Sequence, residues 1–295
     1  MPDYEFVTVD VFTDQRFGGN PLAIFPDARG LTDAQMQALA IEFNLSETTF
    51  VLPPENPANT ARVRIFTPAT ELPFAGHPNV GTGWLLARNG RDTNGKLPFE
   101  EIAGLVKVDV TRDPKGEITN TTIAVPQPLS LGATLPPADI AACVSLAATE
   151  ILTSAHPPLL ASVGNPFIIA EITNDGLTRA VPDLSAFQRA LSNAPDLGER
   201  FALYVYARDG DRIRARMFAP LGSITEDPAT GSAATALAAL LLSLTDAESG
   251  AWDINQGVEM GRPSLLRTTA RRTADGIRAT VGGACVPVLR GTATL

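Results

Sequence analysis

The stretch Gly-Asn-Pro-Leu-Ala-Ile at residues 19–24 has a counterpart in Gly-Asn-Pro-Phe-Ile-Ile at residues 164–169. Two further pairs follow in the same order: Arg-Ile-Phe-Thr-Pro (64–68) with Arg-Met-Phe-Ala-Pro (216–220), and His-Pro-Asn-Val-Gly-Thr (77–82) with Asp-Pro-Ala-Thr-Gly-Ser (227–232). Three ordered pairs indicate an internal duplication. We therefore expect two related halves whose equivalent loops face each other, with His77 and Asp227 opposed in a ligand-binding cleft between the halves.

The length and composition agree with two domains. A chain of 295 residues, 44% of them hydrophobic, suits two cores of roughly 130–150 residues each. The Pro-rich stretch 126–137 is the best candidate linker. The helix predicted after Pro228 is apolar on nearly every side from Ala233 to Leu244, so protein must surround it. A sheet wrapped around this helix, in a barrel-like half, is the expected arrangement.

Other elements follow from hydrophobic periodicity and helix-capping residues. Helices are predicted after Thr32, after Pro78, over 139–148 and after Asp183. Strands are predicted at 5–11, 22–25, 48–52, 62–66, 106–110, 121–125, 167–172, 201–206, 212–218, 277–281 and 285–289.

Charge and residue counts exclude several classes of function. The net charge of −9 and the absence of Lys/Arg clusters disfavour nucleic acid and anionic membranes as partners. The only two cysteines, Cys143 and Cys285, favour a reducing compartment, and no signal peptide or membrane span is predicted. A cytoplasmic location is therefore expected.

The same counts argue against cofactors and metals. The only two histidines, His77 and His156, lack Cys or His neighbours at ligand spacing, which disfavours zinc. The three lysines lie in turn-like or alternating contexts, which disfavours a Schiff-base enzyme. No dinucleotide or Walker loop is present. We expect no cofactor and no metal.

The motifs together resemble those of the PhzF-like (phenazine-biosynthesis) isomerases, relatives in fold of diaminopimelate epimerase. They run from the first strand to the last: Val9-Asp-Val-Phe12, Gly19-Asn20-Pro21, Asn44-Leu-Ser-Glu47-Thr-Thr-Phe50, Phe74-Ala-Gly-His77-Pro78, Glu226-Asp227-Pro-Ala-Thr-Gly-Ser232 and Gln256-Gly-Val-Glu-Met-Gly-Arg-Pro263. As a set these motifs are specific, whereas any one alone is weak.

The resemblance implies an α+β fold of two pseudo-symmetric halves, each a curved, mostly antiparallel sheet around a central helix. The last strand would return to the first half, which gives an N-terminal lobe of residues 1–127 plus 284–295 and a C-terminal lobe of residues 128–283. The resemblance also implies a biosynthetic, cofactor-independent isomerase that acts on a small carboxylate-bearing metabolite, and a homodimer.

Site residues are implied in the same way. The family's proton-shuttling glutamate maps onto Glu47, and its His and Asp ligands map onto His77 and Asp227; these three are the catalytic candidates. The candidates for substrate binding are Asn20, Ser46, Gly76, Thr230, Gly231 and Ser232. Asn79 departs from the family pattern, where many members carry Thr, and this leaves the substrate open.

Each catalytic candidate also has an ordinary structural explanation. Glu47 could lie at a strand start or exposed turn, His77 could be a core histidine, and Asp227 could cap the following helix. In the functional interpretation, an apolar cleft raises the pKa of Glu47 and strengthens it as a base. The first turn of the helix from Thr230 to Ser232 offers free N–H groups to a substrate carboxylate.

The type of reaction follows from the number of bases. Racemases of the related fold use two opposed thiols, but Cys143 and Cys285 lie outside the repeated loops. One carboxylate that lifts a proton and returns it to the same face fits a 1,3-shift. The alternatives are an epimerase that pairs Glu47 with Asp227, and a non-catalytic binding or scaffold protein. The segment around Ser232 lacks the nucleophile elbow of a serine hydrolase.

Overall fold

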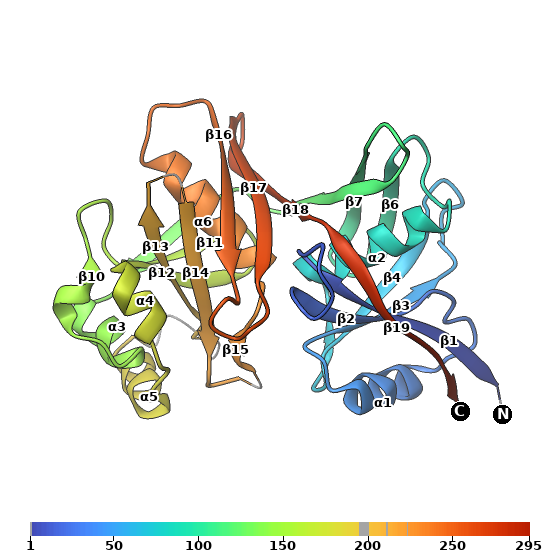
Figure 1. Cartoon of the computed structure of the whole chain (residues 1–295), viewed down its shortest axis with the longest axis horizontal. Coiled ribbons are helices and arrows are strands. Elements are labelled where there is room, and N and C mark those ends of the chain that lie inside the picture. The colour runs from blue at the N-terminus through green and yellow to red at the C-terminus, as the bar shows by residue number, and fades with distance from the viewer. Residues whose placement is uncertain (1, 195–200, 211, 223) are drawn as a thin grey trace. The chain divides into compact units, whose positions relative to one another are not determined.

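The computed structural model describes residues 2–194, 201–210, 212–222 and 224–295. The chain divides into two compact units, residues 1–126 with 281–295 and residues 127–280. Each unit combines a sheet with helices (Figure 1), so the α+β class predicted from the sequence is correct.

The first unit contains the two ends of the described chain. Its elements are β1 (Asp3–Val11), β2 (Asn20–Phe25), α1 (Asp33–Phe43), β3 (Thr48–Leu52), β4 (Ala61–Phe66), β5 (Glu71–Leu72), α2 (Gly76–Arg88), β6 (Lys96–Glu101), β7 (Gly104–Arg112), β8 (Ile118–Ala124) and β19 (Cys285–Thr294). Strand β19 pairs antiparallel with β1 along its whole length, so the first and last strands lie side by side (Figure 1).

The second unit has the same kind of composition. Its elements are β9 (Ser130–Thr134), α3 (Pro137–Cys143), the 3-10 turn η1 (Ala148–Glu150), β10 (Ile151–Leu152), β11 (Leu159–Ser162), β12 (Pro166–Ile172), α4 (Asn174–Arg179), α5 (Leu184–Asn193), β13 (Leu203–Asp209), β14 (Arg212–Ala219), β15 (Ile224–Asp227), α6 (Gly231–Ser243), β16 (Ser249–Gln256), β17 (Ser264–Thr273) and β18 (Gly276–Gly283). The residues of β18 from Val281 onward belong to the first unit.

Strand pairing repeats from one unit to the other. In the first unit β2 runs parallel to β3, β3 antiparallel to β4, β4 parallel to β6 and β6 antiparallel to β7. The second unit has the same order of parallel and antiparallel pairings along β12, β13, β14, β16 and β17. The repeated motifs therefore occupy equivalent strands, since 19–24 enters β2, 164–169 enters β12, and the two Arg-x-Phe motifs lie in β4 and β14.

An ion pair is duplicated with the strands. Arg64 on β4 contacts both oxygens of Glu71 at 2.7 Å, and Arg216 on β14 contacts both oxygens of Glu226 at 2.8 and 2.9 Å. Each guanidinium also lies over the aromatic ring two residues further along its strand, at 5.1 and 4.8 Å from the ring centroid. The strand that carries the carboxylate, β5 or β15, is thereby fixed to its neighbour just before the central helix.

A buried helix forms the centre of each unit. Helix α2 packs against β1, β2, β7 and β8, and α6 packs against β11, β12, β16 and β17. Almost every residue of both helices is buried, as predicted for α6 from its apolar sequence. In α2 glycine permits the close packing, because a Cβ on Gly83 would lie 2.6 Å from Val108 Cγ1.

Several expectations of local structure were wrong. The boundary between the units falls at residues 126 and 127, at the start of the Pro-rich stretch expected to be a linker, but the rest of that stretch contains β9, which pairs with β11. The helix expected over 139–148 ends at Cys143 and is followed by η1. Helix α2 begins at Gly76, two residues before Pro78, because proline is well tolerated in the first turn of a helix. Strands β6, β16 and β17 were not foreseen.

Candidate active site

Three segments of the first unit bring Glu47, His77, Asn20 and Ser46 together. Glu47 immediately precedes β3, His77 is the second residue of α2, and Asn20 begins β2. Glu47 Oε2 lies 3.5 Å from His77 Nε2, and Asn20 Nδ2 lies 3.5 Å from His77 Nδ1. The Ser46 hydroxyl donates to Asn20 Oδ1 at 3.3 Å. These candidates, with Gly76 at the start of α2, thus form one cluster.

The Glu47 side chain is covered rather than exposed. Its side chain is 15% exposed and Oε2 is shielded from solvent. Burial raises the pKa of Glu47 to about 7, and the neighbouring Ser46 hydroxyl opposes the rise. This excludes the exposed turn as the explanation for Glu47. A carboxylate that titrates near neutral pH can both accept and return a proton.

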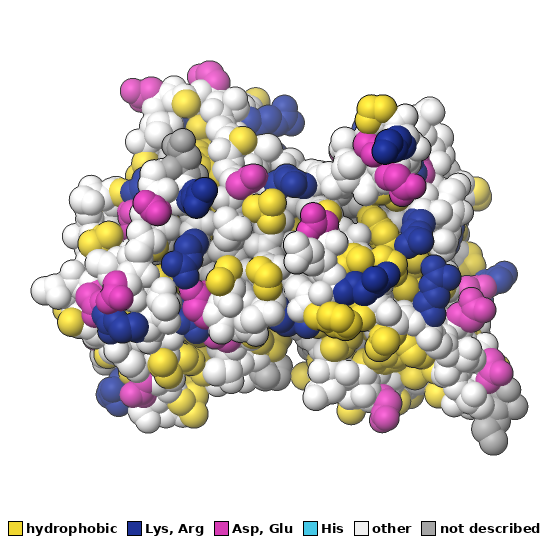
Figure 2. Space-filling model, viewed as in Figure 1, with side chains coloured by type: hydrophobic (Ala, Val, Ile, Leu, Met, Phe, Trp, Pro, Cys, Tyr) yellow, Lys and Arg dark blue, Asp and Glu magenta, His cyan; other side chains and the backbone are white. Residues whose placement is uncertain are grey.

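The histidines are both covered by protein. His77 is 5% exposed and His156 is 4% exposed, and no histidine is visible on the face shown in Figure 2. When Asn20 Nδ2 donates to His77 Nδ1, the neutral imidazole carries its proton on Nε2, the nitrogen that faces Glu47. His156, expected in a loop, does lie between strands, but its Nε2 is 2.9 Å from the hydroxyl of the buried Tyr206.

The Asp10 side chain, in the motif Val9-Asp-Val-Phe12, supports this cluster. Asp10 is 3% exposed, and its Oδ2 accepts from the backbone N–H of Phe17 at 2.7 Å. It thereby holds the turn that leads through Gly19 to Asn20. Gly19 is required there, because its φ is +62° and a Cβ would lie 2.3 Å from Val11 O. The motif alone does not indicate this role of Asp10 in the sequence.

The remaining candidates form a second cluster within the second unit. Asp227 ends β15, Thr230 is the N-cap residue of α6, and Gly231 and Ser232 open that helix. The Thr230 hydroxyl donates to Asp227 Oδ2 at 2.5 Å and makes no capping bond to the helix. The N-cap residue of α6 is thus Thr230 and not Asp227, which was the ordinary explanation considered for Asp227. A helix start left uncapped by its own N-cap side chain is suited to bind an anion.

Neither cysteine offers an activated thiol. Burial raises the pKa of Cys143 to about 12 and that of Cys285 above its usual range.

Among the described residues, no group of three His, Cys, Asp or Glu side chains could hold a metal ion. No helix in the described part of the chain is long and apolar enough to cross a membrane.

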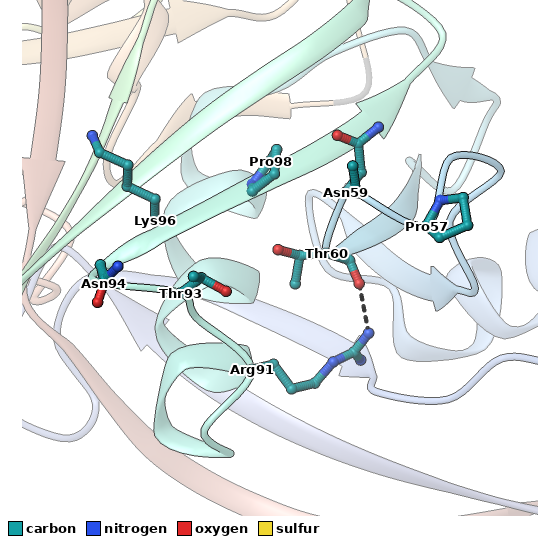
Figure 3. Close-up of a pocket in the computed structure, with 9 residues that line it drawn as sticks. Pro57, Asn59, Thr60, Arg91, Thr93, Asn94, Lys96 and Pro98 are labelled. Carbon is teal, nitrogen blue, oxygen red and sulfur yellow. Dashed lines mark hydrogen bonds between the residues drawn. The ribbon is translucent and has the colours of Figure 1, made fainter.

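An open pocket on the first unit, shown in Figure 3, contains none of the candidates. It is lined by the 57–60 loop and the segment from Arg91 to Pro98. Its two cations already have partners: Arg91 donates to Thr60 O at 2.8 Å, and Lys96 pairs with Asp109 at 2.8 Å. We therefore do not assign the reaction to this pocket.

Comparison with known proteins decides the family. The family described as "Phenazine biosynthesis-like protein" matches residues 9–291. The chain belongs to this family. Among phenazine biosynthesis-like proteins, an uncharacterized isomerase of Mesorhizobium japonicum is 40% identical, with 99% of each chain covered. Trans-2,3-dihydro-3-hydroxyanthranilate isomerase of Pseudomonas fluorescens is 38% identical over 99% of this chain and 100% of its own.

Solved structures of phenazine biosynthesis-like proteins have the same fold. The crystal structure of the PhzF-family protein of Bacillus anthracis matches with a TM-score of 0.88 at 23% identity and covers 100% of both chains. This phenazine biosynthesis-like chain is accordingly an enzyme of the isomerase class.

Proposed function

We propose that the enzyme moves a proton between carbons of a small amino- or hydroxy-carboxylate without a cofactor, with Glu47 as the proton shuttle. The observation that carries this proposal is the covered Glu47 carboxylate, whose pKa burial raises to about 7, beside the Nε2 of His77. A base with this pKa is matched to proton transfer at neutral pH.

The reaction is a balanced 1,3-shift. Glu47 accepts the proton as a C–H bond of the substrate breaks, and the electron pair of that bond moves into the shifted double bond. The electron pair of the original double bond then takes the proton back from Glu47 and forms a new C–H bond at the second carbon. Substrate and product are isomers, so the step needs no oxidant, reductant or co-reactant.

His77 and Asp227 are assigned to orientation of the substrate. His77 presents Nε2–H toward Glu47. In its neutral form, the His77 ring can donate this proton to a hydroxyl oxygen or an amino nitrogen of the substrate. Asp227 can accept from an amino or hydroxyl group, and the N–H groups of Gly231 and Ser232 can bind the carboxylate. That both clusters act on one substrate, in a cleft between the halves, stays a prediction from the sequence.

The substrate class is taken from the relatives. The Pseudomonas fluorescens relative is named for trans-2,3-dihydro-3-hydroxyanthranilate, a ring with amino, hydroxyl and carboxylate substituents. These are the groups that the two clusters can bind, so we propose a substrate of this class. The cytoplasmic location and the homodimer also stay predictions, and gel filtration tests the latter.

The deciding experiment is turnover of trans-2,3-dihydro-3-hydroxyanthranilate in heavy water, followed by mass spectrometry and NMR. We expect an isomeric product, with deuterium at the carbon that receives the proton whenever Glu47 exchanges with solvent before returning it. A panel of cyclic and linear amino and hydroxy acids extends the test. If no member of the panel is isomerised or exchanges hydrogen, the proposed function is wrong.

A further inference from the structure

We propose that Gln256, the last residue of β16, is a positioning residue that fixes the Asp227 side chain for substrate binding. This inference rests on the proposed role of Asp227. It gives a physical role to the Gln256-Gly257 motif, which the proposed mechanism does not use. Gln256 is 1% exposed and contacts Tyr204, Thr230 and the backbone of Asp227.

The orientation of the Gln256 amide is set by backbone groups. Its Oε1 lies 3.1 Å from the backbone N of Thr230, which can only donate. Its Nε2 lies 2.8 Å from the backbone O of Asp227, which can only accept. In the opposite orientation, the amide NH2 would face the N–H of Thr230, and the amide oxygen would face the carbonyl oxygen of Asp227. The amide therefore has one allowed orientation.

This orientation dictates the direction of the next hydrogen bond. The second Nε2 proton of Gln256 points to Thr230 Oγ1 at 3.1 Å. The Thr230 hydroxyl therefore accepts from Gln256, and its single proton is directed to Asp227 Oδ2 at 2.5 Å. A hydroxyl that must donate fixes Asp227 Oδ2 as the acceptor and restrains the side chain.

The backbone around Gln256 is fitted to the loop that it holds. Gly257 has φ +75°, and a Cβ there would lie 2.6 Å from Pro228 O and 2.5 Å from Arg262 O. The Ser264 hydroxyl donates to Pro228 O at 3.1 Å. The motif from Gln256 to Ser264 thus encloses the turn between Asp227 and Thr230, and only glycine allows the approach at position 257.

The duplication provides an independent argument. Strand β6 pairs with β4 in the register that β16 has with β14, since Arg62 lies opposite Glu100 and Arg214 opposite Asn255. Because Arg64 and Arg216 are equivalent, Glu101 is the counterpart of Gln256. Glu101 is also covered, and its polar neighbour is Asn79 in the first turn of α2.

Both halves therefore place a buried polar side chain from this strand end against the start of the central helix. In the first unit, His77 lies at this helix start. In the second unit, Asp227 lies just before the helix start. Burial raises the pKa of Glu101 to about 8, so near neutral pH it is largely a neutral acid that, like the glutamine, has both a donor and an acceptor, although with one donor proton instead of two.

The test uses the full-length enzyme with Gln256→Met, Gln256→Glu and Thr268→Val. Thr268 is a matched control, because its buried hydroxyl bonds Trp252 O in the same β16–β17 pair without contacting Asp227. The first readout is hydrogen exchange of the Thr230 amide in the free enzyme. We expect at least about tenfold faster exchange in Gln256→Met and a wild-type rate in Thr268→Val.

The second readout is the rate with trans-2,3-dihydro-3-hydroxyanthranilate from pH 5.5 to 9, divided by the wild-type rate at each pH. In Gln256→Glu, a protonated carboxyl group can still donate one of the amide's two hydrogen bonds, whereas an ionised one can donate neither. We expect the Gln256→Glu ratio to fall at least about tenfold as pH rises, and the Gln256→Met ratio to be low throughout. The ionisable residues that Gln256 contacts are Asp227 and Tyr204. Burial raises the pKa of Tyr204 above its usual range, so Tyr204 stays protonated over this pH range.

The two readouts separate the possible failures. Wild-type exchange at Thr230 in Gln256→Met, or equal acceleration in Thr268→Val, overturns the positioning role. A Gln256→Glu ratio that does not change with pH also overturns it. If the wild-type enzyme does not turn over the substrate, the proposed function fails, and hydrogen exchange still decides whether Gln256 holds the loop.

Discussion

Glu47 Oε2 lies 3.5 Å from His77 Nε2, a distance at the outer limit of a hydrogen bond. The contact is too long to offset the loss of hydration at the Glu47 carboxylate, and burial consequently raises its pKa to about 7. The histidine is near enough to share a substrate with Glu47 but does not hold the carboxylate in its ionised form. Activity, pH dependence and stability should all reflect this balance.

Replacement of Glu47 by glutamine should reduce the rate of isomerisation by roughly 10²–10⁴. Glutamine keeps the size of the side chain but cannot accept a proton from carbon. Deuterium incorporation from solvent into trans-2,3-dihydro-3-hydroxyanthranilate is the measurement. Glu42→Gln, at an exposed position of α1, is the control and should behave as wild type. Exchange at the wild-type rate in Glu47→Gln would refute the shuttle.

The pH dependence of kcat/KM should show an acid limb near pH 7. The free enzyme needs Glu47 ionised to act as a base, and burial raises the pKa of Glu47 to about 7. Activity should therefore fall about tenfold for each pH unit below this value. Initial rates from pH 5 to 9 provide the measurement. An acid limb near pH 4.5, the ordinary range of a glutamate, would show that Glu47 is not desolvated.

Glu101→Gln should stabilise the first unit at pH 8 and leave it nearly unchanged at pH 4. Burial raises the pKa of Glu101 to about 8, so the folded protein binds this proton more tightly than the unfolded chain does. The free energy of unfolding is then greatest below the unfolded pKa, and decreases as pH rises to about 8. The expected gain at pH 8 is on the order of 1–4 kcal/mol, measured by urea unfolding with Trp84 of the same unit as the probe.

Glu47→Gln provides a comparison in that experiment, because the pKa of Glu47 is also raised. It too should reduce the loss of stability between pH 4 and pH 8. A stability of Glu101→Gln that parallels the wild type at every pH would contradict a buried, neutral Glu101.

Arg216→Met should destabilise the second unit by about 3–5 kcal/mol, because it leaves Glu226 without its cation in a mostly buried site. Arg216 is 7% exposed and also donates to Leu177 O and Ala180 O. The measurement is urea unfolding monitored at Trp252. Arg62→Met is the control, since Arg62 and its partner Glu55 are 44% and 76% exposed, and it should cost less than about 1 kcal/mol. Equal costs would show that burial does not determine the value of these pairs.

Much of the fold could be predicted because the repeated motifs coincide with strands and helix starts. Thr48–Leu52 was predicted with the bounds that β3 has, and α6 was recognised because its apolar residues surround the whole helix. Strand β9 could not be predicted, since Pro126 and Pro128 precede it and all its residues are exposed. Its pairing with β11 depends on backbone hydrogen bonds, which leave no periodic pattern in the sequence.

The candidate site was proposed from residues with recognisable chemistry, and the side chains that position them through hydrogen bonds were missed. Glu47 and His77 were recognised as residue types that carry chemistry. Gln256 and Asp10 act through hydrogen bonds to backbone and hydroxyl groups near the chemistry, and any single sequence contains many such residues. The pair Arg64 and Glu71 recurs in the sequence as Arg216 and Glu226. This recurrence could have indicated the short strand that precedes each central helix.

The pairing of β19 with β1 determines when the first unit can be completed during synthesis. Residues 285–294 leave the ribosome after every other strand of the two units, so this edge of β1 has no partner strand until β19 emerges. Residues 127–280 are contiguous in the chain and carry their own core. We therefore expect the C-terminal half to mature before the N-terminal one, with nascent chains that lack their final strand prone to self-association through the open edge.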